Sequence, residues 1–215
     1  MNDISQRLQV CYTGVVHDVM RALGLRDFTL PAELRPILPE QAIAGPAFTI
    51  EGMVVPGVEA HETLLAWTGL LSKAPAESIW VSQPNDRVVA HMGELSAETL
   101  KNKGVKGCVA DGFIRDVNFL QAIGFQSWCR GFTPRDIVGH WLPTATEVPI
   151  TIGDVVIAPG DYMVGDRDGL IRVPKALAPK IVQAAEGAMA TESLVRKAIL
   201  EGTDPQAAYL KYGKF

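Results

Sequence analysis

The spacing of apolar residues predicts helical structure at the start of the chain. Over the first 24 residues, apolar side chains recur every three to four positions, which is the period of an amphipathic helix, and Gly24 ends this pattern. Gly14 is expected to divide the helix, with Thr13 capping its second part. A polar connection rich in proline follows (Pro31, Pro36 and Pro39).

The middle of the chain alternates short β-like runs with helical ones. The predicted strands are residues 47–55, 78–81, 88–90, 107–110 and 125–129. The predicted helices are residues 59–71, 96–103 and 116–123, and glycine follows the last two. This alternation indicates an α/β domain with a largely buried sheet.

Beyond residue 148 the pattern becomes rich in strands, at 154–157, 162–164 and 170–173. Pro159-Gly160 and Asp168-Gly169 are turn signals between them. Pro174 opens a long helix that reaches about Leu200, and residues 204–215 form a short helix or arm. We therefore expect one domain, with amino-terminal helices and a linker (1–45), an α/β core (46–173) and a carboxyl-terminal helix and tail (174–215).

Composition narrows the classes of protein that are compatible with this pattern. A chain of 215 residues with 47% hydrophobic and 20% charged residues can form one compact domain with a substantial core. The net charge of −4, with no run of Lys or Arg longer than two, argues against a general nucleic-acid binder.

The termini and cysteines favour a cytoplasmic protein with reduced thiols. The first residues lack the basic and apolar segments of a signal peptide, and no stretch approaches the roughly 18 apolar residues of a membrane span. Cys11, Cys108 and Cys129 are widely spaced and form no CxxC motif. Neither a disulfide scaffold nor a thiolate zinc site is supported.

Two segments are suited to binding anions and metals. Residues 93–96 precede a predicted helix, where free backbone N–H groups and the helix dipole attract a carboxylate. Arg115-Asp116 follows a buried strand and opens another helix. Ligands of α/β proteins bind beyond the carboxyl ends of strands, so both segments are expected to face one crevice. The alternative is structural: Asp116 as an N-cap, Glu94 as a partner of the helix dipole and Arg115 in a surface ion pair.

Three motifs carry a resemblance to a known family: Gly-Glu-Leu-Ser-Ala (93–97), Gly-Val-Lys-Gly (104–107) and Asp-Gly-Phe-Ile-Arg-Asp (111–116). They resemble the ribonuclease E activity regulator A and the 4-hydroxy-4-methyl-2-oxoglutarate aldolases. Residues 159–169 and the tail with Tyr209 and Tyr212 match as well, so the likeness runs from about Thr13 to the end. Glu94 and Arg115 are separated by 20 residues, the spacing typical of the aldolase branch, which usually has Asp in place of Glu94.

The resemblance implies a swivelling β/β/α-type fold with a carboxyl-terminal helical arm. It also implies a homotrimer, or a hexamer built as a dimer of trimers, with the active site between subunits. The metal, Mg²⁺ or Mn²⁺, would be held by Asp116, and Arg115 would contact the pyruvate unit. The backbone N–H groups of Gly93, Glu94, Leu95 and Ser96 would bind the substrate carboxylate.

Proton transfer would fall to the side chain of Glu94, which would hold a water molecule. Asp111 and, from a neighbouring subunit, Glu192 are further candidates near the metal. One extra methylene in Glu94, compared with Asp, displaces the carboxylate by about an ångström and changes the geometry of proton transfer.

The sequence therefore predicts a metal-dependent pyruvate aldolase that acts on a 4-hydroxy-2-oxo di- or tricarboxylic acid, such as 4-hydroxy-4-methyl-2-oxoglutarate. Cleavage of C3–C4 leaves an enolate, which the metal and Arg115 would stabilise. Oxaloacetate decarboxylation gives the same enolate and is a predicted second activity. The rival hypothesis is a non-catalytic regulator that binds a ribonuclease, and a third is a small-molecule-binding protein without activity.

Other candidate residues lack a supporting motif. His61-Glu62 is not a zinc-protease motif, because Leu65 occupies the place of the second histidine. His91 adjoins residue 93, and packing or a surface position is favoured over contact with substrate. Cys108 is expected in the core without a neighbouring base. Residues 166–169 are interpreted as a hairpin turn rather than a calcium loop.

Overall fold

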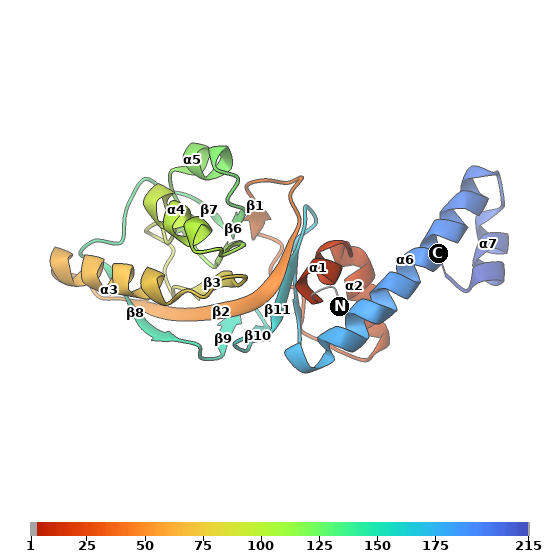
Figure 1. Cartoon of the computed structure of the whole chain (residues 1–215), viewed down its shortest axis with the longest axis horizontal. Coiled ribbons are helices and arrows are strands. Elements are labelled where there is room, and N and C mark those ends of the chain that lie inside the picture. The colour runs from red at the N-terminus through yellow and green to blue at the C-terminus, as the bar shows by residue number, and fades with distance from the viewer. Residues whose placement is uncertain (1–3, 215) are drawn as a thin grey trace.

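The computed structural model describes residues 4–214, and Figure 1 shows a curled sheet flanked by helices, with a long helical arm at one end. The central strands run parallel to one another: β2 (Ile43–Val54), β3 (Ile79–Gln83), β4 (Gly107–Ala110) and β6 (Ser127–Cys129). Their residues are buried almost throughout, as a parallel sheet covered on its faces requires. The predicted α/β alternation is confirmed.

Three helices connect the parallel strands and lie on one face of the sheet (Figure 1): α3 (Ala60–Lys73), α4 (Glu94–Asn102) and α5 (Val117–Ala122). Each turns a few apolar side chains inward, and these join sheet residues such as Phe48 and Trp80 in one core cluster. Each predicted helix lies within about two residues of the observed one.

Antiparallel pairs extend this sheet at both ends of the long strand β2. Its first half pairs with β11 (Tyr162–Gly165), which also pairs with β12 (Leu170–Val173). Its second half pairs with β8 (Trp141–Thr146), where the register shifts between Glu51 and Gly52. A Cβ at Gly52 would lie 1.9 Å from the Trp141 ring, so this close approach requires glycine.

Short strands complete the body of the protein. β1 (Arg35–Pro36) pairs with β6 at the sheet edge. β9 (Ile150–Ile152) and β10 (Val155–Ile157) form a hairpin, and β5 (Phe113–Ile114) pairs in parallel with β7 (Gly131–Phe132). The β5–β7 pair lies just beyond the carboxyl ends of β4 and β6, and it carries the chain toward the crevice described below.

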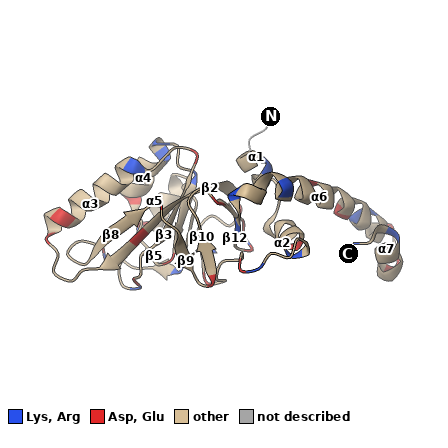
Figure 2. Cartoon of the chain, turned by 90° about the horizontal axis from the view of Figure 1, so that it is seen from below, with Lys and Arg blue, Asp and Glu red and all other residues tan. Residues whose placement is uncertain are grey.

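The amino- and carboxyl-terminal helices form a second packed unit. α1 (Ile4–Gln9) and α2 (Thr13–Ala22) pack against α6 (Ala178–Leu200), which follows a short 3₁₀ turn (Lys175–Leu177). α6 continues beyond the body, and α7 (Pro205–Tyr212) folds back along it (Figure 1). Figure 2 shows acidic and basic residues interspersed along these helices. Within residues 4–214, no helix has both the length and the apolar character that crossing a membrane needs.

Two local predictions are wrong, because side chains capture backbone groups. Residues 88–90 form no strand: the N–H groups of Val88 and Val89 donate to the Asp86 carboxylate instead of to a neighbouring strand. The amino-terminal helix is interrupted at residues 10–12 rather than at Gly14, and Thr13 begins α2 without capping it. The Asp166 carboxylate accepts hydrogen bonds from the Thr13 N–H and hydroxyl and takes that role.

Both predicted turns of the strand-rich region are confirmed, but several strands were not predicted. Asp168-Gly169 turns the β11–β12 hairpin, as expected. Pro159-Gly160 lies in the turn between β10 and β11, also as expected, although these two strands belong to different sheets. The apolar pattern predicts neither β8 and β9 nor the three two-residue strands β1, β5 and β7. These strands are short or carry mixed polar and apolar residues, and only pairing with distant segments stabilises them.

Candidate active site

A cavity of about 430 Å³ opens where α3, the start of α4, residues 115–116 and the loop 133–140 meet. The segments that precede α4 and α5 leave the carboxyl ends of the neighbouring parallel strands β3 and β4. They are tied together by backbone hydrogen bonds from His91 N–H to Phe113 O (2.8 Å) and from Arg115 N–H to Met92 O (2.9 Å). The structure therefore brings residues 93–96 and Arg115-Asp116 to one crevice, as the sequence predicts.

Asp116 occupies the N-cap position of α5 but does not cap that helix with its side chain. Its backbone is left-handed (φ 56°), a conformation that is uncommon outside glycine, asparagine and aspartate. This geometry turns the carboxylate toward α4, where Oδ2 accepts a hydrogen bond of 3.1 Å from the Glu94 N–H. Asp116 is therefore the N-cap of α5 by position, as the structural alternative expects, while its carboxylate lies at the positive end of a different helix, α4.

Gly93 permits this arrangement because it has no side chain. Its backbone is extended (φ −152°), which any residue can adopt, so the requirement is one of space. A Cβ at this position would lie 2.8 Å from Asp116 Oδ2 and 3.1 Å from Arg115 Cγ. Any larger residue would displace the Asp116 carboxylate or the Arg115 side chain.

The Arg115 guanidinium lies between two carboxylates without being saturated by them. Its Nε is 3.5 Å from Asp116 Oδ2, and its Nη1 is 3.6 Å from Asp136 Oδ2. These separations are those of ion pairs rather than of short hydrogen bonds, so the N–H groups can still bind a further anion. The side chains of Arg115 and Asp116 are 38% and 37% exposed, which leaves both accessible from the crevice.

Asp136 is a residue of the crevice that no sequence motif predicts. It lies in the loop after β7, which follows the next parallel strand after β4, and it stands in no recognisable motif. Asp136 follows the predicted strand that corresponds to β6, and β6 pairs with β4 in the sheet. This place in the chain is the one signal that could have put Asp136 near the same edge of the sheet.

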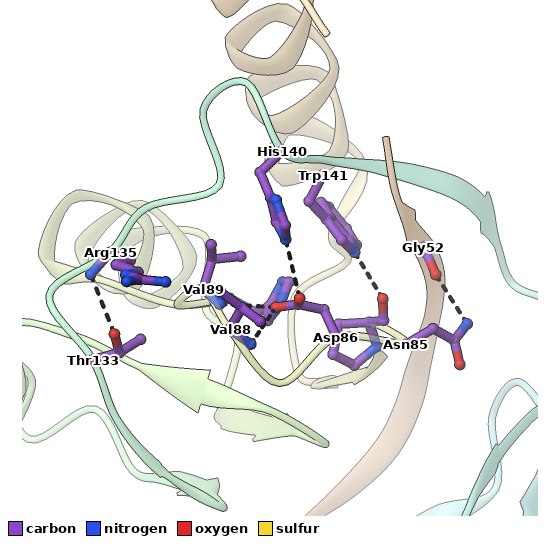
Figure 3. A network of polar contacts seen from close by, with 11 residues as sticks. Gly52, Asn85, Asp86, Val88, Val89, Thr133, Arg135, His140 and Trp141 are labelled. Carbon is purple, nitrogen blue, oxygen red and sulfur yellow. Dashed lines mark hydrogen bonds and ion pairs between the residues drawn. The ribbon is translucent and has the colours of Figure 1, made fainter. Parts of the chain in front are cut away.

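The loop 133–140 forms one wall of the crevice, and the buried carboxylate of Asp86 holds it in place (Figure 3). Asp86 Oδ1 contacts His140 Nε2 at 3.2 Å, at the end of this loop. Asp86 Oδ2 contacts His91 Nε2 at 3.0 Å and accepts the N–H groups of Val88 and Val89. One carboxylate therefore fixes both the segment that leads to Gly93 and the loop that carries Asp136.

These contacts set the charge states of the pair Asp86 and His91. Burial alone would raise the pKa of Asp86, but its backbone and imidazole donors outweigh burial and lower the pKa far below its usual range. Burial lowers the pKa of His91, although Asp86 opposes that shift. Among the described residues no hydrogen bond reaches His91 Nδ1, which suits a neutral imidazole that donates from Nε2. His91 is buried and packs against Trp141, in agreement with the packing role expected from the sequence.

The remaining candidates lie in different surroundings. Glu94 borders the crevice. Asp111 does not: it is buried and pairs with Arg130 Nε (2.6 Å) and Arg87 Nη2 (3.1 Å). Glu192 lies on α6, where it contacts the Tyr12 hydroxyl and Lys214 Nζ, and it borders a different hollow from the crevice of its own chain.

The cysteines form no nucleophilic site. Burial raises the pKa of the Cys108 thiol well above its usual value and that of Cys129 to about 11. Both thiols are therefore protonated near neutral pH, and they pack in the core cluster under α4 and α5.

The donors at the crevice suit a hard divalent cation that keeps water and ligand oxygens around it. Among the described residues there is no group of three or more His, Cys, Asp or Glu side chains placed to enclose a metal. Within the same residues, no hydrogen bond reaches Asp116 Oδ1, while Oδ2 is held by Glu94 N–H. A single free carboxylate oxygen fits Mg²⁺, which is commonly bound through one or two carboxylates and retains several waters.

The fold and this crevice define an α/β protein of the RraA-like type. The sequence model of the RraA-like family, described as Aldolase/RraA, matches residues 13–172, so the chain belongs to this family. A protein of Halalkalibacterium halodurans, provisionally named 4-hydroxy-4-methyl-2-oxoglutarate aldolase, is 29% identical over 192 residues, which are 87% of this chain and 85% of that protein.

Solved structures confirm the expected fold, with its central sheet and carboxyl-terminal helix. An uncharacterised protein from Pseudomonas syringae pv. tomato superposes with a TM-score of 0.87 at 26% identity, covering 97% of this chain and 93% of that one. Streptomyces coelicolor RraAS2, described as an unusual member of the RNase ES inhibitor RraA protein family, gives 0.80 at 27% identity, covering 91% and 96%.

The Asp86 network makes a prediction about stability. Asp86→Asn should lower the free energy of unfolding at pH 7 by about 2 kcal/mol, because charge-assisted hydrogen bonds become neutral ones. The folded pKa of Asp86 lies below its unfolded value of about 4, so its ionised form stabilises the fold above that pH and ceases to do so as pH falls below it. Urea denaturation should therefore show the gap between wild type and variant narrowing toward about pH 3.

Glu40→Gln is the matched control, because Glu40 is an exposed carboxylate paired with Arg167 at the surface. It should change the free energy of unfolding by less than about 0.5 kcal/mol. An Asp86→Asn gap that stays constant between pH 7 and pH 3 would show that the carboxylate charge does not hold this network.

Proposed function

We propose that this protein is a divalent-metal-dependent aldolase that cleaves a 4-hydroxy-2-oxo acid and releases pyruvate. The observation that carries the proposal is the Asp116 carboxylate, held at the start of α4 beside the incompletely paired Arg115 in one crevice. The provisional aldolase name of the Halalkalibacterium halodurans relative supports the same reaction class.

The head of such a substrate has complementary partners in the crevice. The first turn of α4 leaves the N–H groups of Leu95 and Ser96 without acceptors inside the helix, and these donors suit the substrate carboxylate. Arg115 provides a cation for the C2 oxygen. Asp116 would hold Mg²⁺ or Mn²⁺ through its free oxygen, and the metal would act as a Lewis acid on the 2-oxo group.

Cleavage of the C3–C4 bond requires a base and a group that stabilises the developing negative charge. Glu94, which borders the crevice, would remove the proton of the C4 hydroxyl, directly or through a water molecule. The C3–C4 bond then breaks, and C4 becomes a carbonyl carbon. The electron pair of the broken bond stays with C3 and forms the enolate of pyruvate. The Arg115 guanidinium stabilises the charge on the C2 oxygen, and protonation of C3 completes the reaction.

Oxaloacetate decarboxylation is proposed as a second activity of the same site. Loss of CO₂ from oxaloacetate leaves the same enolate, so it needs Arg115 but no base for a C4 hydroxyl. The two reactions should therefore respond alike to changes in Arg115 and differently to changes in Glu94.

A ribonuclease-binding regulator is the alternative, and the similarity to Streptomyces coelicolor RraAS2 is the observation that favours it. Binding a ribonuclease requires a protein-binding surface. It does not explain why a carboxylate and a guanidinium are held beside the start of a helix in a crevice. The enzyme proposal accounts for that geometry.

The central prediction concerns Asp116 and Arg115. Asp116→Asn and Arg115→Ala should each lower the rate of pyruvate release by at least about a thousandfold, since each removes stabilisation of the enolate charge. Pyruvate release from 4-hydroxy-4-methyl-2-oxoglutarate and from oxaloacetate is measured with lactate dehydrogenase. EDTA should abolish both activities, and added Mg²⁺ should restore them.

Glu40→Gln and Arg167→Ala are the matched controls, because these residues form an exposed carboxylate–guanidinium pair that does not line the crevice. Both should retain wild-type rates. Wild-type rates in the Asp116 and Arg115 variants, with folding intact by circular dichroism, would defeat the assignment. Absence of turnover in the wild type would favour the regulator.

We further propose that the chain assembles as a homotrimer or hexamer, which the projecting arm of α6 and α7 makes possible. Exposed apolar side chains gather on this arm (Leu194, Leu200, Tyr209 and Leu210) and would be covered by another copy. Gel filtration with light scattering should give three or six times the mass of 23.2 kDa. A stable, active monomer would contradict the proposal.

A further inference from the structure

The Asp136 carboxylate divides its two oxygens between its own loop and Arg115. Oδ1 accepts a hydrogen bond of 3.2 Å from the Val138 N–H, which holds the side chain in a turn of the loop 133–140. Oδ2 faces the guanidinium and lies 3.6 Å from Arg115 Nη1. The backbone of the loop therefore directs one oxygen of Asp136 toward Arg115.

The part of this loop that precedes Asp136 is fixed to the strands and segments that carry Arg115. The Thr133 N–H donates a hydrogen bond of 3.1 Å to the carbonyl of Ile114, the residue directly before the arginine. The Ala90 N–H donates one of 2.9 Å to the carbonyl of Arg135, the residue directly before the aspartate. The backbones on either side of the ion pair are thus joined through the same edge of the sheet.

The part of the loop that follows Asp136 is held from the other side. Ile137 is buried, and the Gly139 N–H donates a hydrogen bond of 3.3 Å to the Thr63 hydroxyl on α3. His140 Nε2 then contacts the buried Asp86 carboxylate at 3.2 Å (Figure 3). The loop is anchored on both sides of Asp136, so its carboxylate is a fixed reference point for the mobile side chain that it faces.

Arg115 gains orientation from two such points. An arginine side chain has several rotatable bonds, and immobilising it costs side-chain entropy. Asp116 Oδ2 lies 3.5 Å from Nε, and Asp136 Oδ2 lies near a different nitrogen, Nη1. Because the guanidinium is planar, contacts at two of its nitrogens restrict the direction of the plane as well as its position.

We propose that Asp136 is a positioning residue that orients the Arg115 guanidinium toward the C2 oxygen of the substrate. The inference rests on the proposed function, in which Arg115 stabilises the charge that develops on that oxygen. Orientation matters most in the transition state, because the charge is larger there than in the bound substrate. The contacts that carry the inference join residues of one chain, whatever a neighbouring subunit adds to the crevice.

The simpler explanation is that Asp136 is only a nearby negative charge, and it predicts the opposite effect. Such a charge would repel an anionic ligand, so its removal would tighten binding. Asp136→Asn separates the two explanations. The amide has nearly the same shape, and its oxygen can still accept from the Val138 N–H, so the NH₂ group faces Arg115 and cannot pair with it.

Asp136→Asn should lower kcat for oxaloacetate decarboxylation by at least about tenfold, because the guanidinium is no longer held where the charge develops. KM should stay the same or fall, since a negative charge has been removed from the surroundings of an anionic substrate. Calorimetry with Mg²⁺ should show that oxalate, which mimics the pyruvate enolate, binds at least about fivefold more weakly.

Asp154→Asn is the matched control, because it makes the same chemical change at an exposed carboxylate in the β9–β10 turn, which does not line the crevice. It should keep the wild-type kcat and the wild-type affinity for oxalate.

A double-mutant cycle tests whether Asp136 acts through Arg115. In the Arg115→Ala background the guanidinium is absent, so adding Asp136→Asn should change the affinity for oxalate by less than about twofold. If Asp136→Asn weakens oxalate binding equally with and without Arg115, the carboxylate does not act through the arginine, and the inference is wrong.

The remaining outcomes separate this inference from the proposed function. An unchanged kcat with tighter binding of oxalate in Asp136→Asn would overturn the positioning role and leave the aldolase proposal intact. A raised KM together with a melting temperature lowered by more than about 5 °C would assign Asp136 to the stability of the loop alone, and it would also overturn the role. If the wild type neither releases pyruvate nor binds oxalate, the proposed function fails and the inference fails with it.

Discussion

The hydrogen bond from the Glu94 N–H to the Asp116 carboxylate joins two helices that start from neighbouring strands of one parallel sheet. It forms because Asp116 adopts a left-handed backbone and because Gly93 leaves room for its side chain. In consequence a carboxylate, a guanidinium and the free N–H groups of a helix start converge on one crevice. A carboxylate suited to a cation and a set of N–H donors suited to an anion thus lie side by side, which is the arrangement that the proposed recognition of a chelating 2-oxo acid needs.

The Asp86 carboxylate also joins separate segments, but it does so beneath the crevice rather than in it. It is buried and holds two histidines and two backbone N–H groups, and it thereby fixes the loop that brings Asp136 to within 3.6 Å of Arg115. Its ionised state depends on those donors, since burial by itself opposes the charge. The geometry around Arg115 is therefore supported by a network that does not touch the crevice, as a preorganised site needs.

Much of the fold could be predicted from the sequence because the apolar periodicity there is strong and local. The helices α3, α4 and α5 and the parallel strands between them lie close to the predicted positions. Residues 88–90 were misassigned because a carboxylate competes with the sheet for their N–H groups, and periodicity does not register such competition. The strand β8 is stabilised by pairing with β2, which is distant in the sequence, so the local apolar pattern does not predict it either.

In the candidate site as well, residues in local motifs could be predicted, whereas residues placed by contacts between distant segments could not. Residues 93–96, Arg115 and Asp116 could be found, because both segments lie at the start of a helix that the apolar periodicity predicts, and the motifs around them resemble a known family. Asp136 and Asp86 could not, because their roles arise from loops that meet only in the folded chain. Asp111 was a reasonable candidate by proximity in sequence, but two arginines bind it outside the crevice.

The most direct measurement of the central claim is the affinity of Gly93→Ala for oxalate, a planar dianion that resembles the enolate of pyruvate, in the presence of Mg²⁺. The added Cβ would lie 2.8 Å from Asp116 Oδ2, while the extended backbone at this position tolerates alanine. Calorimetry should show at least about tenfold weaker binding than in the wild type, with a melting temperature lowered by only a few degrees at most. Wild-type affinity in this variant would show that the carboxylate beside Gly93 takes no part in holding the ligand or its metal.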